Sequence, residues 1–319
     1  MNNIKRIILR TAARMGLNEL AGSTASQSAF CIGYHSIRSR RNSKELSGEL
    51  YWNLSIDEEE FDAQITYLKK HGHTFVTVGN LLNAVKKGIK KPTAIYFDDG
   101  YRDNLLNALP ILKKHAVPAT VFVTTGAIDR TCLLWTLSLR NLYRKIGKEN
   151  VEEEIAKLKD LLAHEAAERV DEVYRAHGLK LDSDDFDMFL SWEEVGRLAQ
   201  EGIEIGSHTV THPNLTKVDA ARMNSELVES KSRIEEKIGV SVGSLSYPYG
   251  RVNGEVADAA RAAGYRCAIG GVEGWNSFRT IQSRRFELRK IAPRPGGDIV
   301  DFATRMYLFP LRKRISEFL

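Results

Sequence analysis

Short apolar runs alternate with amphipathic segments along most of this chain, and this alternation is the strongest constraint on its fold. The runs are rich in β-branched and aromatic residues and are too short to be helices, so each predicts a buried strand. They lie at 29–35, 74–78, 93–97, 119–123, 203–207, 244–247, 266–269 and 286–291. Segments with helical spacing separate them, at 57–70, 103–115, 192–201, 217–238 and 254–263. This alternation predicts a parallel α/β sheet, and so many units in one chain predict closure into a barrel.

Three parts of the chain fall outside this rhythm. Residues 130–190 form a long, charged, helix-forming stretch, which predicts a helical insertion in one loop. Both ends of the chain are basic and amphipathic. We therefore expect a basic N-terminal helix over 1–28, a barrel over 29–298 that contains the insertion, and a basic C-terminal helix over 299–319. Such terminal helices either pack on the barrel or lie on an anionic membrane surface, which would make peripheral membrane contact.

Composition excludes several classes of protein. The chain has 319 residues, of which 43% are hydrophobic and 27% charged, as in globular rather than disordered, collagenous or disulfide-stapled proteins. The net charge of +5 is too small to indicate a nucleic-acid partner. The three cysteines lie far apart in apolar contexts, so we expect buried thiols. There is no apolar run of membrane-spanning length and no secretory signal, so a cytoplasmic location is expected; the oligomeric state stays open.

Two adjacent carboxylates follow the third of these strands, in the motif Asp98-Asp99-Gly100. Neighbouring carboxylates repel each other unless a cation or a shared proton offsets the charge, so a pair at a strand end often marks a metal or acid/base site. Gly100 permits a sharp turn that could direct both side chains into one cleft. The alternative is that both aspartates cap the helix that follows.

Two histidines four residues apart, His208 and His212, follow the strand 203–207. Pro213 disfavours a helical conformation at His212, so we expect a tight loop that brings both imidazoles to one side. Together with one carboxylate of the aspartate pair, they would supply two nitrogens and one oxygen. That ligand set leaves a position open for water, as in catalytic zinc sites.

The strand 244–247 ends in the turn Tyr247-Pro248-Tyr249-Gly250. Pro248 restricts the backbone and Gly250 frees it, so the turn could direct the Tyr249 N–H at an oxyanion while the tyrosine rings line a sugar-sized groove. The alternative is an ordinary turn whose two aromatic rings pack on the core.

In this combination and order, the three motifs resemble those of the polysaccharide deacetylases, the NodB-homology group or carbohydrate esterase family 4. The resemblance covers most of residues 30–295. It implies a distorted (β/α) barrel of about seven parallel strands, the NodB-type deacetylase barrel, from which the helical insertion projects. It also implies a divalent metal cofactor, for which we expect zinc.

The resemblance assigns a role to each motif residue. Asp98 matches the general base and Asp99 a metal ligand, while His208 and His212 match the two metal-binding histidines. Tyr247 and Tyr249 match residues that line the substrate groove.

Three features depart from the family pattern. Ser246 stands where many members have an arginine that orients the base, so that contact must be absent or come from elsewhere. The fourth motif is present only as Glu273-Gly274-Trp275, from which we assign Trp275 to substrate binding. The fifth, a Leu-x-His sequence, is missing, because no histidine follows His212.

We expect His35 to replace the missing histidine as the general acid. It ends the first predicted strand, and the first and last strands of a closed barrel are neighbours, so moving the histidine strand to the N-terminus preserves the site. This order resembles that of deacetylases acting on poly-N-acetylglucosamine-type exopolysaccharides. The alternative is a strand-end histidine packed by Tyr34.

The expected function is metal-dependent hydrolysis of N-acetyl groups on a polysaccharide or glycan precursor, with release of acetate and a free amino sugar. The expected partner is therefore an N-acetylated glycan. Two alternatives are a deacylase or amidohydrolase of a small non-carbohydrate substrate, and a low-activity metal-containing glycan-binding protein. Asp98 favours an enzyme, because a pure binding protein has no need of a base.

Overall fold

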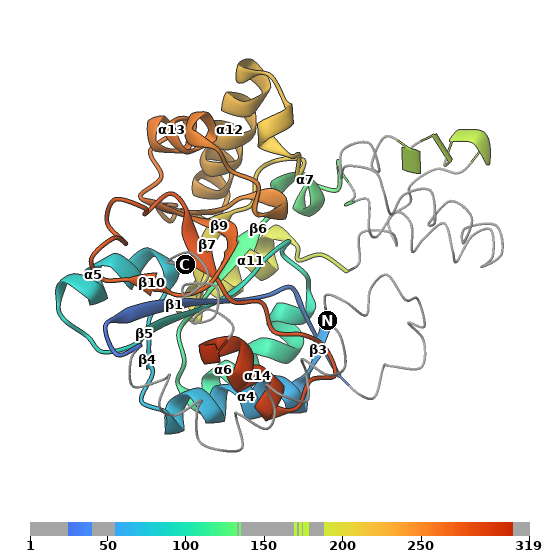
Figure 1. Cartoon of the computed structure of the whole chain (residues 1–319). Helices are drawn as coiled ribbons and strands as arrows, with labels where there is room; N and C mark the ends of the chain where they lie inside the picture. Colours follow the sequence, from blue (N-terminus) through green and yellow to red (C-terminus); the bar gives the residue numbers. More distant parts are fainter. Residues whose placement is uncertain are drawn as a thin grey trace.

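The computed structural model describes residues 25–39, 55–132, 134, 169–170, 172–173, 175–178 and 188–308. Its centre is a sheet of parallel strands surrounded by helices (Figure 1). In spatial order these strands are β1 (Ser28–Tyr34), β5 (Pro92–Phe97), β6 (Ala119–Val123), β7 (Glu204–Ser207), β8 (Ser244–Ser246), β9 (Cys267–Glu273) and β11 (Leu288–Lys290). Every residue of β1 and β5 is buried, which is why their sequences are mostly apolar rather than alternating.

Backbone contacts between the two ends of this strand order close the sheet. Ile32 and Ile291 form a parallel bridge. The N–H of Gly33 donates to the Ile291 carbonyl at 2.9 Å, and the N–H of Ile291 donates to the Cys31 carbonyl at 2.8 Å. The expected distorted barrel of about seven parallel strands is therefore confirmed. Its first strand, β1, lies between β5 and β11.

Helices cover the outside of the barrel, and each of the five predicted helical segments is helical. The helices are α4 (Glu58–Lys70), α5 (Leu81–Lys86), α6 (Leu109–His115), α7 (Thr125–Ile128), α11 (Trp192–Gln200), α12 (Ala220–Ile238), α13 (Gly254–Ala262) and α14 (Ile299–Ala303). Short 3-10 or π segments are η2 (Val78–Asn80), η3 (Asn104–Ala108), η5 (Leu215–Lys217), η6 (Pro248–Gly250) and η7 (Thr304–Leu308). Side chains cap the N-termini of α11 and α12: the Ser191 side chain accepts from the Glu194 N–H, and Asp219 accepts from the Arg222 N–H.

Some short strands differ from the prediction. The run 74–78 forms only the two-residue strand β4 (Thr74–Phe75), because the chain turns into η2 at Val78. Two further strands, β2 (Ser36–Arg38) and β3 (Ser55–Asp57), form a separate parallel pair. The strand β10 (Asn276–Ser277) pairs antiparallel with the start of β1. Strands of two or three residues are too short to leave a readable pattern in sequence.

The proposed insertion 130–190 lies mostly outside the described residues, and so do residues 1–24 and 309–319. Part of the predicted C-terminal helix is described, and there Phe302, Met306 and Tyr307 are buried. The ring of Phe302 contacts Tyr67 of α4, and that of Tyr307 contacts Phe30 of β1. These apolar residues therefore pack on the barrel. In the described part of the chain, no helix has the length and apolar character needed to cross a bilayer.

Candidate active site

The polar residues predicted to carry chemistry follow the carboxyl ends of neighbouring strands. His35 comes directly after β1, Asp98 and Asp99 after β5, His208 after β7, and Tyr249 shortly after β8. In a parallel barrel these strand ends share one rim, where the connecting loops bring side chains together.

Asp99, His208 and His212 form a compact, buried cluster. Oδ1 of Asp99 lies 3.4 Å from Nε2 of His208 and 3.6 Å from Nε2 of His212. The structure therefore brings together the three residues predicted as metal ligands, from two loops that are far apart in the sequence.

The other ring nitrogen of each histidine is held by a hydrogen bond. Nδ1 of His208 lies 2.7 Å from the carbonyl oxygen of Ser246, and Nδ1 of His212 lies 3.0 Å from the Tyr249 hydroxyl. Because a carbonyl can only accept, Nδ1 of His208 carries a proton, and Nε2 of the neutral ring then has a free lone pair. Such outer hydrogen bonds orient metal-binding histidines in known sites.

This set of donors fits a divalent metal ion. The three ligand atoms lie within 4.8 Å of one another. Zinc bonds of about 2.0–2.2 Å at tetrahedral angles would separate neighbouring ligand atoms by roughly 3.3 Å, close to the separations of Asp99 from the two rings. Among the described residues, no hydrogen-bond donor serves the buried Oδ1 of Asp99, as expected for an atom whose partner is a cation.

The surroundings shift the pKa values of the cluster. Burial acts to raise the pKa of Asp99, but contact with His208 and the charges of His35 and His212 hold that pKa well below its usual value. Burial and the neighbouring His208 lower the pKa of His212 to about 3. At neutral pH the cluster therefore contains a carboxylate and an uncharged imidazole at His212, the forms that metal binding requires. At His208, Asp98 and Asp99 together outweigh burial and raise the pKa.

The backbone at the rim adopts left-handed conformations that side chains disfavour. The φ angles are 76° at Asp99, 69° at Thr209, 59° at His212 and 58° at Tyr249. Such conformations cost roughly 1–3 kcal/mol each and cluster at functional sites. After Tyr249 the turn requires glycine, because a Cβ on Gly250 would lie 2.3 Å from the Cα of Gly271.

Glu226 of α12 holds the loop between the two histidines. Its buried carboxylate accepts the N–H groups of Val210 at 2.8 Å and Thr211 at 2.9 Å, and also the Thr211 hydroxyl. We did not predict this role from the sequence. A readable signal exists, because Glu226 shares the buried face of α12 with Met223 and Leu227.

Asp98 and His35 face each other beside the cluster. Nε2 of His35 lies 4.0 Å from Oδ2 of Asp98, with the His35 side chain 27% exposed and that of Asp98 5% exposed. The pairing of β1 with β5 sets this approach, and the Asp98 N–H donates to the Tyr34 carbonyl at 2.9 Å. His35, at the end of the first strand, therefore lies beside Asp98, as expected if the histidine strand has moved from the C-terminus to the N-terminus.

Ser246 contributes to the site through its backbone. Its carbonyl holds His208, as described above. Within the described ranges, no lysine or arginine forms an ion pair with Asp98, whereas Nε2 of His35 lies 4.0 Å from its Oδ2. No described lysine or arginine therefore takes the place of the arginine that is absent at Ser246.

The two tyrosines assigned to the substrate groove have different surroundings. Tyr249 is 36% exposed, and its ring centroid lies 4.6 Å from that of His212. Tyr247 is 1% exposed and belongs to the apolar core, and burial raises the pKa of its hydroxyl. The role predicted for Tyr247 is therefore corrected: its side chain packs in the core and does not line the groove.

Trp275 is not brought to the site. It is buried in the apolar core, with its ring edge-on to Phe30. The next two residues, Asn276 and Ser277, pair with the start of β1, whereas the site lies at the other end of that strand. Its assignment to substrate binding is corrected to core packing.

Sequence comparison relates this arrangement to a known family. A profile described as polysaccharide deacetylase matches residues 85–268, more than half of the chain. The matched region contains the aspartate pair, both histidines and the tyrosine turn. The chain belongs to the polysaccharide deacetylase family. This confirms the resemblance predicted from the three motifs.

Curated members of this family match most of the chain. It is 27% identical over 239 residues to the protein YxkH of Bacillus subtilis, which covers 74% of this chain and 62% of that protein. It is 25% identical over 260 residues to the poly-beta-1,6-N-acetyl-D-glucosamine N-deacetylase of Staphylococcus aureus, which covers 75% of this chain and 70% of that enzyme. The chain thus spans less than two thirds of the first of these relatives.

Solved structures of deacetylases share the fold. The Streptococcus pyogenes deacetylase PplD in complex with acetate superimposes with a TM-score of 0.62 at 19% identity, covering 88% of this chain and 99% of that one. IcaB from Ammonifex degensii gives a TM-score of 0.58 at 18% identity, covering 87% and 97%. At these identities the likeness concerns the fold, and it agrees with the distorted barrel described above.

Proposed function

We propose that this polysaccharide deacetylase family member is a metal-dependent N-deacetylase of an N-acetylated polysaccharide or glycan precursor. Its products would be acetate and a free amino sugar. The observation that carries the proposal is the cluster of Asp99, His208 and His212 with Asp98 and His35 beside it. The substrate named for the Staphylococcus aureus relative supports a polymer of N-acetylglucosamine.

The three clustered residues would hold the divalent ion, and zinc fits their nitrogen and oxygen donors. A bound ion would supply Lewis acidity, polarising the acetyl carbonyl and lowering the pKa of the attacking water. The Ser246 carbonyl and the Tyr249 hydroxyl would keep the two imidazoles in their binding orientation.

The proton transfers are assigned to Asp98 and His35. Asp98 would accept a proton as water attacks the acetyl carbon, and His35 would give a proton to the sugar nitrogen as the C–N bond breaks. The Tyr249 N–H would donate to the oxyanion of the tetrahedral intermediate. The greater exposure of His35 suits a group that meets the departing amino sugar.

Acetate release from N-acetylglucosamine oligomers tests this function. We expect no release after chelation and full recovery when zinc or cobalt is added. The control is His115→Ala, because His115 pairs with Asp62 and takes no part in the cluster; it should retain both metal and activity. Release that is insensitive to chelation would overturn the metal dependence. Absence of release with metal bound would overturn the substrate class.

A further inference from the structure

The short strand β2 starts directly after His35. A neighbouring strand pairs with one edge of β2, and side chains bind the other edge. Its strand partner is β3, in the register Ser36↔Ser55 to Arg38↔Asp57. The opposite edge faces η3 and the residue before it. This segment begins at Asp103, shortly after Asp98 and Asp99 in the sequence.

Two asparagines of η3 bind backbone carbonyls on that edge. Nδ2 of Asn104 donates to the His35 carbonyl at 2.8 Å, and Nδ2 of Asn107 donates to the Ile37 carbonyl at 2.7 Å. These carbonyls belong to alternate residues, as do the groups along one edge of a strand. The η3 side chains thus replace a second neighbouring strand.

Asp103, the residue before η3, completes the contact. Its carboxylate accepts the Ser36 hydroxyl and the Ile37 N–H. Burial raises its pKa to about 7, against these hydrogen bonds and the charge of Arg38. Residues 103–107 therefore bind the backbone of His35 and Ile37 and the side chain of Ser36 between them.

This contact joins the two residues assigned to proton transfer. The chain that carries Asp98 at the end of β5 continues into η3, and Asn104 there is 2% exposed. The described η3 is a π-helix, a rare conformation that occurs often at functional sites. One continuous piece of chain thus supplies the proposed base and holds the backbone of the proposed acid.

We propose that Asn104 is a positioning residue for His35. By fixing the His35 carbonyl, it sets where the imidazole lies relative to Asp98 and to the sugar nitrogen, so this role rests on the proposed function. Asn104 contacts neither the metal ligands nor substrate in this assignment. A displacement of about 1 Å at a catalytic group can cost roughly 100-fold in rate, so one backbone hydrogen bond suffices for a measurable effect.

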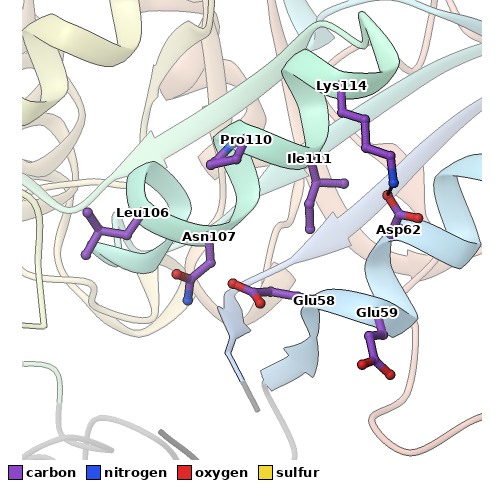
Figure 2. A pocket seen from close by; sticks show the side chains of 8 residues that line it. All are labelled: Glu58, Glu59, Asp62, Leu106, Asn107, Pro110, Ile111 and Lys114. Atoms are coloured by element: carbon purple, nitrogen blue, oxygen red, sulfur yellow. Dashed lines mark hydrogen bonds and ion pairs between the residues drawn. The ribbon is translucent and has the colours of Figure 1, made fainter. Parts of the chain in front are cut away.

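The first test compares Asn104→Ala with Asn107→Ala. We expect Asn104→Ala to lower kcat about 10- to 100-fold while KM and zinc content stay close to those of the wild type. Asn107→Ala removes the same kind of bond but from Ile37, and kcat should stay within about twofold. Figure 2 shows Asn107 beside Leu106 at a surface groove between η3 and α4, which the substrate site does not include. Equal losses in the two variants would overturn the proposal.

The second test is a double-mutant cycle with His35→Ala. If Asn104 acts through His35, its removal should cost little in a chain that already lacks the imidazole. Additive losses in kcat would show that Asn104 acts elsewhere and would overturn the proposal.

The third test does not need activity. Side-chain NMR of isotope-labelled histidine, with the His35 signal assigned from His35→Ala, should show that signal shifted or broadened in Asn104→Ala and unchanged in Asn107→Ala. A chain that releases no acetate would overturn the proposed function, yet this measurement would still decide whether Asn104 holds His35. An unmoved signal in Asn104→Ala would overturn the proposal itself.

Discussion

At the scale of single residues, two adjacent carboxylates point to different partners. The left-handed φ of 76° at Asp99 turns its side chain toward His208 and His212, whereas Asp98 lies opposite His35. Neighbouring residues on a regular strand would point to opposite faces, so the turn after β5 is what lets both carboxylates lie at the same site while they contact different histidines. The separate roles proposed for Asp98 and Asp99 can therefore be tested by substituting each aspartate on its own.

Asp98→Asn should lower turnover by about 10²- to 10⁴-fold, because the amide cannot take the proton of the attacking water. Its metal content, measured by atomic absorption, should match that of the wild type. Asp99→Asn is the paired control, and it should lose metal together with activity. Normal turnover in Asp98→Asn, or loss of its metal, would contradict the assignment of Asp98 as the base.

His35→Ala should slow deacetylation by about 10²- to 10⁴-fold without weakening metal binding, because only protonation of the leaving amine is lost. An aryl acetate, whose leaving group needs no proton, should be hydrolysed at nearly the wild-type rate by the same variant. Equal losses on both substrates would argue against His35 as the general acid.

At the scale of elements, the loop proposed to bind the metal is held by the helix packed beside it. The loop from Thr209 to His212 contains two left-handed residues, and Glu226 of α12 binds two of its N–H groups. The loop therefore keeps its shape through a buried carboxylate on another element.

Glu226→Gln should weaken zinc binding about 10- to 100-fold, because a neutral amide oxygen accepts the two loop N–H groups more weakly than a charged carboxylate does. Zinc affinity can be measured by competition with a chromogenic chelator. Glu229→Gln is the control on the same helix, since Glu229 is exposed and bonds only to Ser225 among the contacts described. Unchanged zinc affinity in Glu226→Gln would contradict the role of Glu226.

At the scale of the whole molecule, the C-terminal segment is tied to the barrel through a buried histidine. The ring of His73 lies 2.6 Å from the Thr93 hydroxyl of β5 and 2.7 Å from the Tyr307 hydroxyl of η7. Burial, together with the charges of Lys91 and His71, lowers the pKa of His73 from 6.5 to about 3. His73 is therefore neutral in the folded chain at pH 5, whereas in the unfolded chain it is largely protonated.

The unfolded chain thus binds a proton that the folded chain does not, and stability falls as the pH falls from 6.5 toward 3. Between pH 7 and pH 5 this costs about 2 kcal/mol in the free energy of unfolding. His73→Gln, which cannot titrate, should lose correspondingly less over that interval in urea unfolding. An identical loss in both proteins would contradict the low pKa of His73.

Local patterns predicted the barrel, and together with the family resemblance they predicted the candidate metal ligands. Buried parallel strands are continuous apolar runs, and the polar residues that end them share one rim, so one carboxylate of the aspartate pair could be grouped with His208 and His212 without coordinates. The resemblance to the family selected Asp99 from that pair. His35 also could be placed, because closure of a barrel makes its first and last strands neighbours.

The direction and burial of individual side chains depended on the tertiary structure. Tyr247 and Tyr249 are two residues apart in one turn, yet the first packs in the core and the second reaches His212, because the left-handed backbone at Tyr249 changes the direction of its side chain. Trp275 follows β9, but the next two residues, Asn276 and Ser277, pair with the start of β1. That end of β1 is opposite to the end that carries the site. Glu226 and Asn104 meet their partners only across helix–loop contacts, which depend on how the elements pack and leave no periodic signal in the chain.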